Sequence, residues 1–238
     1  MTELLISRAG AVTTLTLNRP DKANALNTAL VEALHEALNQ AAAYAPRLIV
    51  LRGEGRNFCA GFDFGGFEDL SMAELSWRFV RMEQLLQWLY HAPCATMAVA
   101  QGGCFGAGAD LLLACDERVA LPDARLRMPG WKFGLALGTR RLAARIGAAP
   151  ARGMLGAAAV VDAAEALRLG LVTQVAEAAG LPDLLARAEA GAQSLTAEAQ
   201  QRLHALTLTD TRAADMAALV ESLTAGDLKA RIRAFRAV

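Results

Sequence analysis

Two short stretches rich in small residues have the composition needed to hold a ligand oxygen with backbone N–H groups. The first is residues 58–64, with the sequence FCAGFDF, and the second is residues 102–110, with the sequence GGCFGAGAD. Each follows an apolar run that is typical of a β-strand. Glycine and alanine let a backbone amide approach a ligand carbonyl, and glycine also adopts backbone angles that other residues avoid. Two such loops can therefore form an oxyanion hole, a pair of N–H groups that stabilises a negatively charged oxygen.

Together with two further segments, these loops resemble the crotonase superfamily, also called the enoyl-CoA hydratase/isomerase family. The further segments are LNRP with NALN, at residues 17–20 and 24–27, and the run from Val99 to ACD at residues 114–116. All four matches come in the order of the family, and the likeness extends from about Leu4 to the C-terminus. The resemblance implies that the N–H groups of Ala60 and Ala107 hold the thioester oxygen of an acyl-CoA substrate.

Asp110 lies three residues after Ala107 and is the one acidic residue of the second stretch, which it ends. A carboxylate beside an oxyanion hole can move a proton to or from a carbon next to the thioester carbonyl. A carboxylate also suits the first turn of a helix, where the helix dipole favours it by about 0.3 to 1 kcal/mol. The sequence leaves both roles open for Asp110.

The resemblance to the hydratases of the family is incomplete at the acid and base positions. Those enzymes carry one glutamate three residues past the second oxyanion donor and another twenty residues further on, where this chain has Asp110 and Gly130. Hydration needs one group to activate water and another to deliver a proton. The missing second carboxylate argues against the two-glutamate mechanism. Gly130 leaves room for a bulky acyl group, a water molecule or a small anion.

We therefore expect a lyase or isomerase that acts on an acyl-CoA thioester, in which Ala60 and Ala107 polarise the carbonyl and Asp110 moves a proton. Isomerisation, or the making or breaking of a C–C bond, fits one carboxylate better than hydration does. The alternative is a protein of the same fold that has lost catalysis and serves as an acyl-CoA-binding or assembly subunit. Gly130 is the main support for that alternative.

The resemblance also implies a set of substrate contacts, and the CoA of the substrate is the only cofactor-like group expected. The predicted substrate-binding residues are Lys22, Ala23, Ala25, Gly61, Phe62, Asp63, Phe64, Gly106, Gly130 and Trp131. The first three would approach the phosphate and pantetheine end, and residues 62–64 would lie by the adenine end. Lys22 could instead be a solvated charge. Trp131 could line the acyl pocket, but packing in the core is the more frequent fate of a lone tryptophan.

The elements that must position these residues alternate between strand and helix patterns. Residues 12–17, 47–51, 95–100 and 118–121 have strand patterns, and residues 28–44 have the apolar spacing of a helix capped by Asn27 or Thr28. A second helix begins after Ser71 and ends before Pro93, and a third covers residues 109–115. This alternation predicts an α/β core. The resemblance implies a spiral of ββα units with a helical C-terminal region.

Composition narrows the possible partners and compartments. The 24 basic and 24 acidic residues balance, which argues against a nucleic-acid partner. The N-terminus lacks the features of a signal peptide and no apolar run is long enough for a membrane span, so we expect a cytoplasmic protein without membrane contact. The spacing of the four cysteines fits neither a metal site nor disulfides, which predicts free buried thiols.

The chain divides into two predicted regions. Residues 1–180 would form the core with the acyl-CoA site. Residues 181–238 are rich in alanine and leucine and would form helices that pack in an oligomer. The resemblance implies a homotrimer or a hexamer, built as a dimer of trimers, because crotonases assemble in this way.

Overall fold

Six strands form the larger sheet of the computed structural model, which describes residues 2–237. Their order across the sheet is β1-β2-β3-β4-β6-β9. Strands β1 and β2 pair in antiparallel fashion, and all other neighbouring strands of this sheet are parallel. In this register Leu15 of β2 lies opposite Leu51 of β3, and Leu51 lies opposite Ala98 of β4. The strands are β1 (Leu4–Ala9), β2 (Val12–Leu17), β3 (Leu48–Gly53), β4 (Ala95–Ala100), β6 (Glu117–Ala120) and β9 (Gln174–Val175).

A second, smaller sheet holds the loop at residues 102–110 in place. It has the order β5-β7-β8, with the strands β5 (Gly103–Phe105), β7 (Arg125–Arg127) and β8 (Val161–Asp162). The parallel pairing of β5 with β7 sets Phe105 opposite Arg127. The segment that continues to Gly130 therefore runs beside the second small-residue loop.

Ten α-helices surround the sheets within residues 2–237. They are α1 (Thr28–Tyr44), α2 (Met72–Tyr90), α3 (Ala107–Ala114), α4 (Thr139–Ile146), α5 (Ala148–Ala157), α6 (Ala163–Leu169), α7 (Leu181–Gln193), α8 (Ala197–Thr207), α9 (Arg212–Thr224) and α10 (Leu228–Arg236). Three short 3-10 helices are η1 (Pro20–Lys22), η2 (Gly130–Phe133) and η3 (Ala178–Gly180). None of the helices described is long and apolar enough to cross a membrane.

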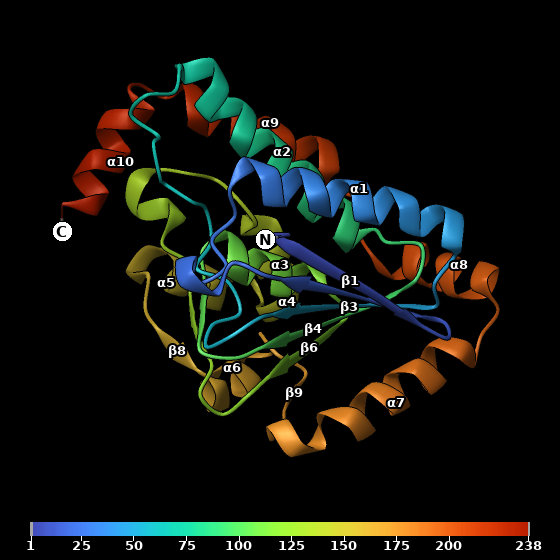
Figure 1. Ribbon diagram of the computed structural model, residues 1–238. Helices are drawn as coiled ribbons and strands as arrows, with labels where there is room; N and C mark the ends of the chain where they lie inside the picture. Colours follow the sequence, from blue (N-terminus) through green and yellow to red (C-terminus); the bar gives the residue numbers. More distant parts are fainter. Residues whose placement is uncertain (1, 238) are drawn as a thin grey trace.

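Both faces of the larger sheet are buried, because helices cover each of them. Ile49 and Leu51 of β3 point into the main core, which α1, α2 and α3 complete. Leu48 and Val50 point to the other face and pack against α7. Figure 1 shows α1 and α2 on one side of the sheet and α7 on the other. This arrangement explains why β3 is a continuous apolar run rather than an alternating one.

Local signals in the sequence place the helix starts correctly. The side chain of Asn27 accepts a hydrogen bond from Leu30 N at 2.8 Å, as expected for the cap of α1. Ser71 and Glu74 form a reciprocal capping box at the start of α2. The helix expected at residues 109–115 begins two residues earlier, at Ala107. The short strands β5, β7, β8 and β9 and the edge strand β1 were not predicted.

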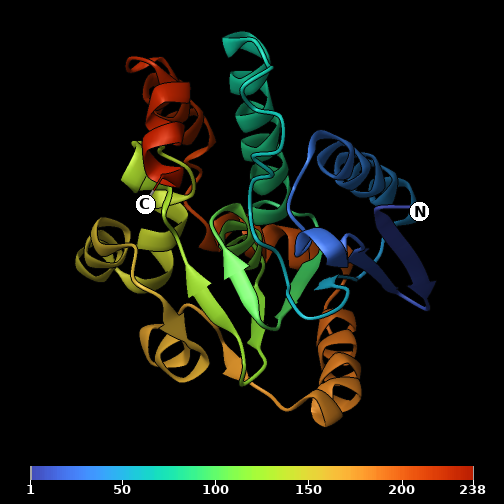
Figure 2. The same cartoon turned by 60° about the vertical axis from the view of Figure 1, so that its left-hand side comes forward.

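The predicted α/β core with a helical C-terminal region is therefore confirmed. Helix α9 packs beside α2, and α10 packs on η2 of its own chain; Figure 2 shows the red C-terminal helices next to the yellow-green segment that contains η2. The rings of Phe235 in α10 and Phe133 in η2 have centroids 5.1 Å apart. Helices α7 to α10 begin at Leu181, where the predicted second region begins. The role of that region in oligomer packing stays a prediction.

Candidate active site

A cavity of about 80 Å³ lies where the two small-residue loops meet. Most of its wall is apolar or aromatic. The lining residues are Ala60, Phe62, Phe64, Phe79, Phe105, Gly106, Ala107, Asp110, Met128, Pro129, Gly130, Trp131, Leu135, Leu137 and Leu155. Asp110 is the only ionisable side chain among these described residues. The fold thus brings both loops and the candidate acid or base to one apolar site.

The N–H group of Ala107 is available at the start of α3. Gly106 precedes it with φ +51°, and the first intrahelical bond of the turn runs from Asp110 N to Gly106 O at 3.0 Å. The first N–H groups of a helix have no intrahelical partner and carry the positive end of the helix dipole. Within residues 2–237 Ala107 N donates to no other group, so it can bind an anionic oxygen.

Gly61 brings the first loop close to this amide. It has φ +88°, and a Cβ atom there would lie 2.5 Å from Phe105 O and 3.2 Å from Ala107 N. Only glycine tolerates both the backbone angle and the contact. The packing of the two loops against each other therefore depends on this residue.

The predicted first donor, Ala60, does not fit the structure. Its N–H group donates to Ala23 O at 2.9 Å and so is not free for a ligand. Phe62 N, two residues later, has no hydrogen-bond partner within the described chain, although Leu26 N donates to Gly61 O and Asp63 N to Leu26 O. Phe62 also lines the cavity. The open amide of the first loop is therefore that of Phe62.

Asp110 is buried, and few groups around it stabilise the negative charge of its carboxylate. Its exposed fraction is 3%, and Oδ1 has no hydrogen-bond partner within the described residues. Burial raises the pKa of Asp110 to about 7, while the charge of Arg141 lowers this pKa and that of Glu83 raises it. A carboxyl group with such a pKa can both accept and donate a proton near neutral pH.

Gly138 makes room for the Asp110 carboxylate. A Cβ atom on Gly138 would lie 1.5 Å from Asp110 Oδ1, and the φ of +65° also favours glycine. Three residues further, Arg141 forms a buried ion pair with Glu83, with N···O distances of 2.6 and 2.8 Å. Sequence analysis missed the roles of Gly138, Arg141 and Glu83, since nothing in their spacing shows that they lie near Asp110.

Gly130 and Trp131 lie in the cavity wall as predicted, but their surroundings differ from expectation. Gly130 O accepts a hydrogen bond from Leu135 N at 2.9 Å, and a Cβ atom on Gly130 would lie 3.3 Å from Leu135 O. The glycine thus allows a tight turn. Trp131 is 45% exposed and donates from Nε1 to Thr139 Oγ1 at 3.0 Å. The prediction that it packs in the core was wrong.

The remaining predicted contacts lie outside the cavity, apart from Phe64 and Gly106 in its wall. Lys22 is exposed, Ala23 uses its carbonyl for Ala60, and Ala25 O accepts a hydrogen bond from Arg19. The Asp63 carboxylate pairs with Arg19 at 2.9 Å. Contact of these residues with CoA stays a prediction.

The four cysteines are buried and free, as predicted. Burial raises the pKa of Cys59, Cys94 and Cys115 to about 12, so these thiols stay protonated. No group of three possible metal ligands occurs within the described residues.

Comparison with known proteins finds similar sequences and structures that are described as enoyl-CoA hydratases or isomerases. The family model described as enoyl-CoA hydratase/isomerase matches residues 7–231. A probable enoyl-CoA hydratase of Mycobacterium bovis is 38% identical over 173 residues, which cover 71% of this chain and 69% of the relative. A crystal structure of a candidate enoyl-CoA hydratase/isomerase from Bordetella parapertussis superposes with a TM-score of 0.98 at 44% identity over all of both chains. An enoyl-CoA hydratase structure from Bacillus anthracis gives a TM-score of 0.81 at 26% identity, covering 98% of this chain and 96% of that one.

Proposed function

The chain belongs to the enoyl-CoA hydratase/isomerase family, and from that membership we propose that it binds an acyl-CoA thioester with the carbonyl oxygen between Phe62 N–H and Ala107 N–H. The observation that carries this proposal is that both amides lack partners within residues 2–237 and belong to residues that line one cavity. Such a donor pair stabilises the negative oxygen of an enolate, and one donor is typically worth about 2.7 to 4 kcal/mol of barrier.

Asp110 is the proton-transferring group of the proposed reaction. Its carboxylate removes a proton from the carbon next to the thioester carbonyl, and the electron pair of that C–H bond moves to the carbonyl oxygen. The resulting enolate is held by the two amides. The same carboxyl group then returns the proton two carbons further along the acyl chain, and the double bond shifts. A pKa of about 7 suits both steps, because it nearly matches the working pH.

The reaction we favour is therefore isomerisation of an enoyl-CoA rather than hydration. One group can carry a single proton between two carbons, whereas hydration needs a second group for the water. Among the described residues that line the site, only Asp110 has an ionisable side chain, and Gly130 occupies the position of the second carboxylate in the hydratase pattern. The cavity of about 80 Å³ is smaller than the ~150 Å³ that holds a benzene molecule. We therefore expect a short acyl group.

A second candidate is a protein of the same fold that binds acyl-CoA without turning it over. One observation favours it: the described cavity wall contains a single ionisable side chain, and Oδ1 of that side chain is unpartnered. Both candidates predict thioester binding. They differ in whether the bound thioester reacts.

The test measures turnover and binding with 2-enoyl-CoA and 3-enoyl-CoA thioesters of four to twelve carbons. It is run with and without bicarbonate, because Gly130 leaves room for a small anion. Wild-type protein should shift the double bond of the shortest substrates. Asp110→Asn should lower kcat by more than about a hundredfold while thioester binding persists. Asp69→Asn, which changes an exposed carboxylate outside the cavity, should leave kcat unchanged.

Each other outcome has a distinct meaning. Turnover that survives Asp110→Asn would remove Asp110 from the mechanism. Binding without turnover in wild-type protein would favour the second candidate. If none of the thioesters binds, the proposed site is wrong.

A further inference from the structure

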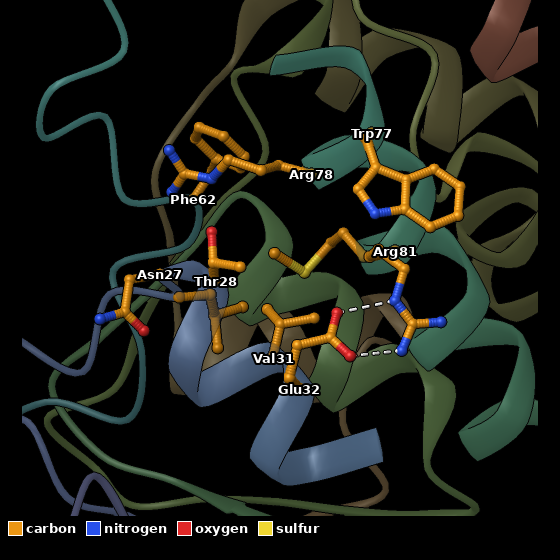
Figure 3. A pocket seen from close by; sticks show the side chains of 10 residues that line it. Asn27, Thr28, Val31, Glu32, Phe62, Trp77, Arg78 and Arg81 are labelled. Atoms are coloured by element: carbon orange, nitrogen blue, oxygen red, sulfur yellow. Dashed lines mark hydrogen bonds and ion pairs between the residues drawn. The ribbon is translucent and has the colours of Figure 1, made fainter. Parts of the chain in front are cut away.

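Arg78 of α2 contacts the loop that carries the Phe62 amide in two ways. Its Nη2 donates a hydrogen bond to Asp63 O at 2.9 Å. Its guanidinium carbon lies 4.5 Å from the centroid of the Phe62 ring. Figure 3 shows Arg78 beside Phe62, whereas Arg81 on the next turn is directed away toward Glu32. One side chain thus contacts the residue that carries the open amide and the residue that follows it.

The neighbouring polar groups of this loop are already occupied. Gly61 O accepts from Leu26 N at 2.7 Å, and Asp63 N donates to Leu26 O at 3.1 Å. The Asp63 carboxylate accepts from Arg19 at 2.9 Å and from Gly65 N at 2.9 Å. These bonds hold residues 61–63 on both sides of the Phe62 N–H group, which has no partner among residues 2–237.

The Phe62 ring has a second neighbour on the same helix. Phe79 stacks on it with the centroids 4.2 Å apart and the planes 13° from parallel. Arg78 and Phe79 are adjacent in the sequence, so one turn of α2 fixes the ring through a stacked aromatic and a cation–π contact. A fixed ring restricts the rotation of the Phe62 backbone and hence the direction of its N–H bond.

We propose that Arg78 is a positioning residue that holds the Phe62 N–H group in the direction needed to bind the thioester oxygen. This inference rests on the proposed function. Oxyanion stabilisation depends on donors that already point at the developing charge, because reorienting them during the reaction costs free energy. Arg78 supplies that order from outside the cavity, since it is absent from the cavity wall.

The hollow next to Arg78 supports a positioning role over a ligand contact. It lies between α1 and α2, where Phe62, Trp77, Arg78 and Arg81 form part of its wall (Figure 3). Its volume of about 20 Å³ is room for little more than one water molecule, which needs ~10–15 Å³. The hollow is therefore too small for a substrate group, and Arg78 acts through Phe62.

The test uses the ultraviolet absorption of a bound short-chain 2,4-dienoyl-CoA thioester, together with kcat and KM for isomerisation of a short 3-enoyl-CoA. Two hydrogen bonds to the carbonyl oxygen polarise the conjugated system and shift its absorption to longer wavelength. Wild-type protein should give this shift. Arg78→Ala should reduce the shift and lower kcat by about tenfold to a hundredfold, with KM nearly unchanged, because a small misplacement of a catalytic group costs that much.

Two further variants separate positioning from general damage. Arg78→Lys keeps the positive charge but loses the planar stacking group, so it should recover part of the shift and part of kcat. Arg81→Ala removes an arginine of the same helix that bonds Glu32 instead of the loop, and it should match wild-type protein. Thermal unfolding of each variant checks that it is folded.

A wild-type shift that persists at full size in Arg78→Ala, with kcat unchanged, would overturn this inference and leave the proposed function intact. If Arg78→Ala does not fold, Arg78→Lys decides: an intermediate shift supports positioning and a full shift contradicts it. A wild-type protein that binds the thioester without any shift would contradict the proposed oxyanion hole itself, and the role of Arg78 with it.

Discussion

At the scale of single residues, Asp110 combines a functional advantage with a cost in stability. Its carboxylate is enclosed by apolar side chains and one of its oxygens has no partner within the described residues. Removing a charged group from water is unfavourable unless it is paired, so the folded state favours the protonated form. A pKa of about 7 makes the group a useful acid and base, and the same burial means that the ionised form weakens the fold.

This cost predicts how stability depends on pH. Asp110 titrates near 7 when folded and near ~3.9 when unfolded. Between these values Asp110 holds more protons in the folded protein, so its contribution to the free energy of unfolding falls as pH rises from about 4 to about 7 and then stays level. Asp110→Asn removes this titration, so the variant should be more stable than wild type at pH 8. The difference between their free energies of unfolding should grow in favour of the variant by up to about 4 kcal/mol from pH 4 to pH 8.

Denaturant unfolding of both proteins at pH 4, 6 and 8 measures this difference. Asp69→Asn serves as the control, because the Asp69 carboxylate is exposed. The difference in stability between this variant and wild type should stay nearly constant from pH 4 to pH 8. An Asp110→Asn stability difference that is equal at all three pH values would show that Asp110 is not buried in the ionised form.

At the scale of elements, the start of α4 packs closely against the first turn of α3. Gly138 is the N-terminal cap of α4, and its missing side chain leaves the space that the Asp110 carboxylate fills. The two helices therefore approach each other as closely as a glycine allows. A residue with a Cβ atom at this cap would move either α4 or the carboxylate.

Gly138→Ala should destabilise the protein for two reasons that a double mutant separates. The left-handed backbone costs an alanine about 1 kcal/mol, and the clash with Asp110 adds to it. In an Asp110→Ala background the clash disappears, so Gly138→Ala should cost only the backbone part. Chemical denaturation of the four proteins in the cycle gives the coupling free energy between the two sites. Additive effects would contradict the contact.

At the scale of the whole molecule, a buried charge network ties three distant parts of the chain together. Arg141 of α4 pairs with Glu83 of α2, and both side chains are at most 2% exposed. Arg141 also lies 3.7 Å from Asp215 of α9. The charge of Arg141 also lowers the pKa of Asp110 in the cavity wall. The network therefore joins α2, α4 and the C-terminal helix α9 through charges as well as through apolar packing.

Glu83→Gln should therefore destabilise the whole fold, by about 3 to 5 kcal/mol, because it leaves the Arg141 charge buried and less well paired. The comparison is Glu165→Gln, which removes one partner of an exposed pair with Arg168 and should have no measurable effect. Thermal and denaturant unfolding check both. A Glu83→Gln variant as stable as wild type would mean that the network contributes specificity at most.

Much of the fold and part of the site could be predicted because their signals are local. The caps of α1 and α2 are encoded by Asn27 and by Ser71 with Glu74, within one turn of the helices that they start. The loops could be found because only small residues allow two backbones to approach as Gly61 and Ala107 do. The short strands β8 and β9 could not, since two residues carry no periodicity.

From the sequence alone it could be predicted that the two small-residue loops and Asp110 would share a site, because small residues let backbone amides reach a ligand oxygen and Asp110 lies only three residues after the second amide donor in the chain. Only the tertiary structure decided which amide is open. Whether an N–H group is free depends on its partner, and the partner of Ala60 is the carbonyl of Ala23, far away in the chain. The same holds for the raised pKa of Asp110 and for the space at Gly138, since burial and contact arise only when distant segments pack together.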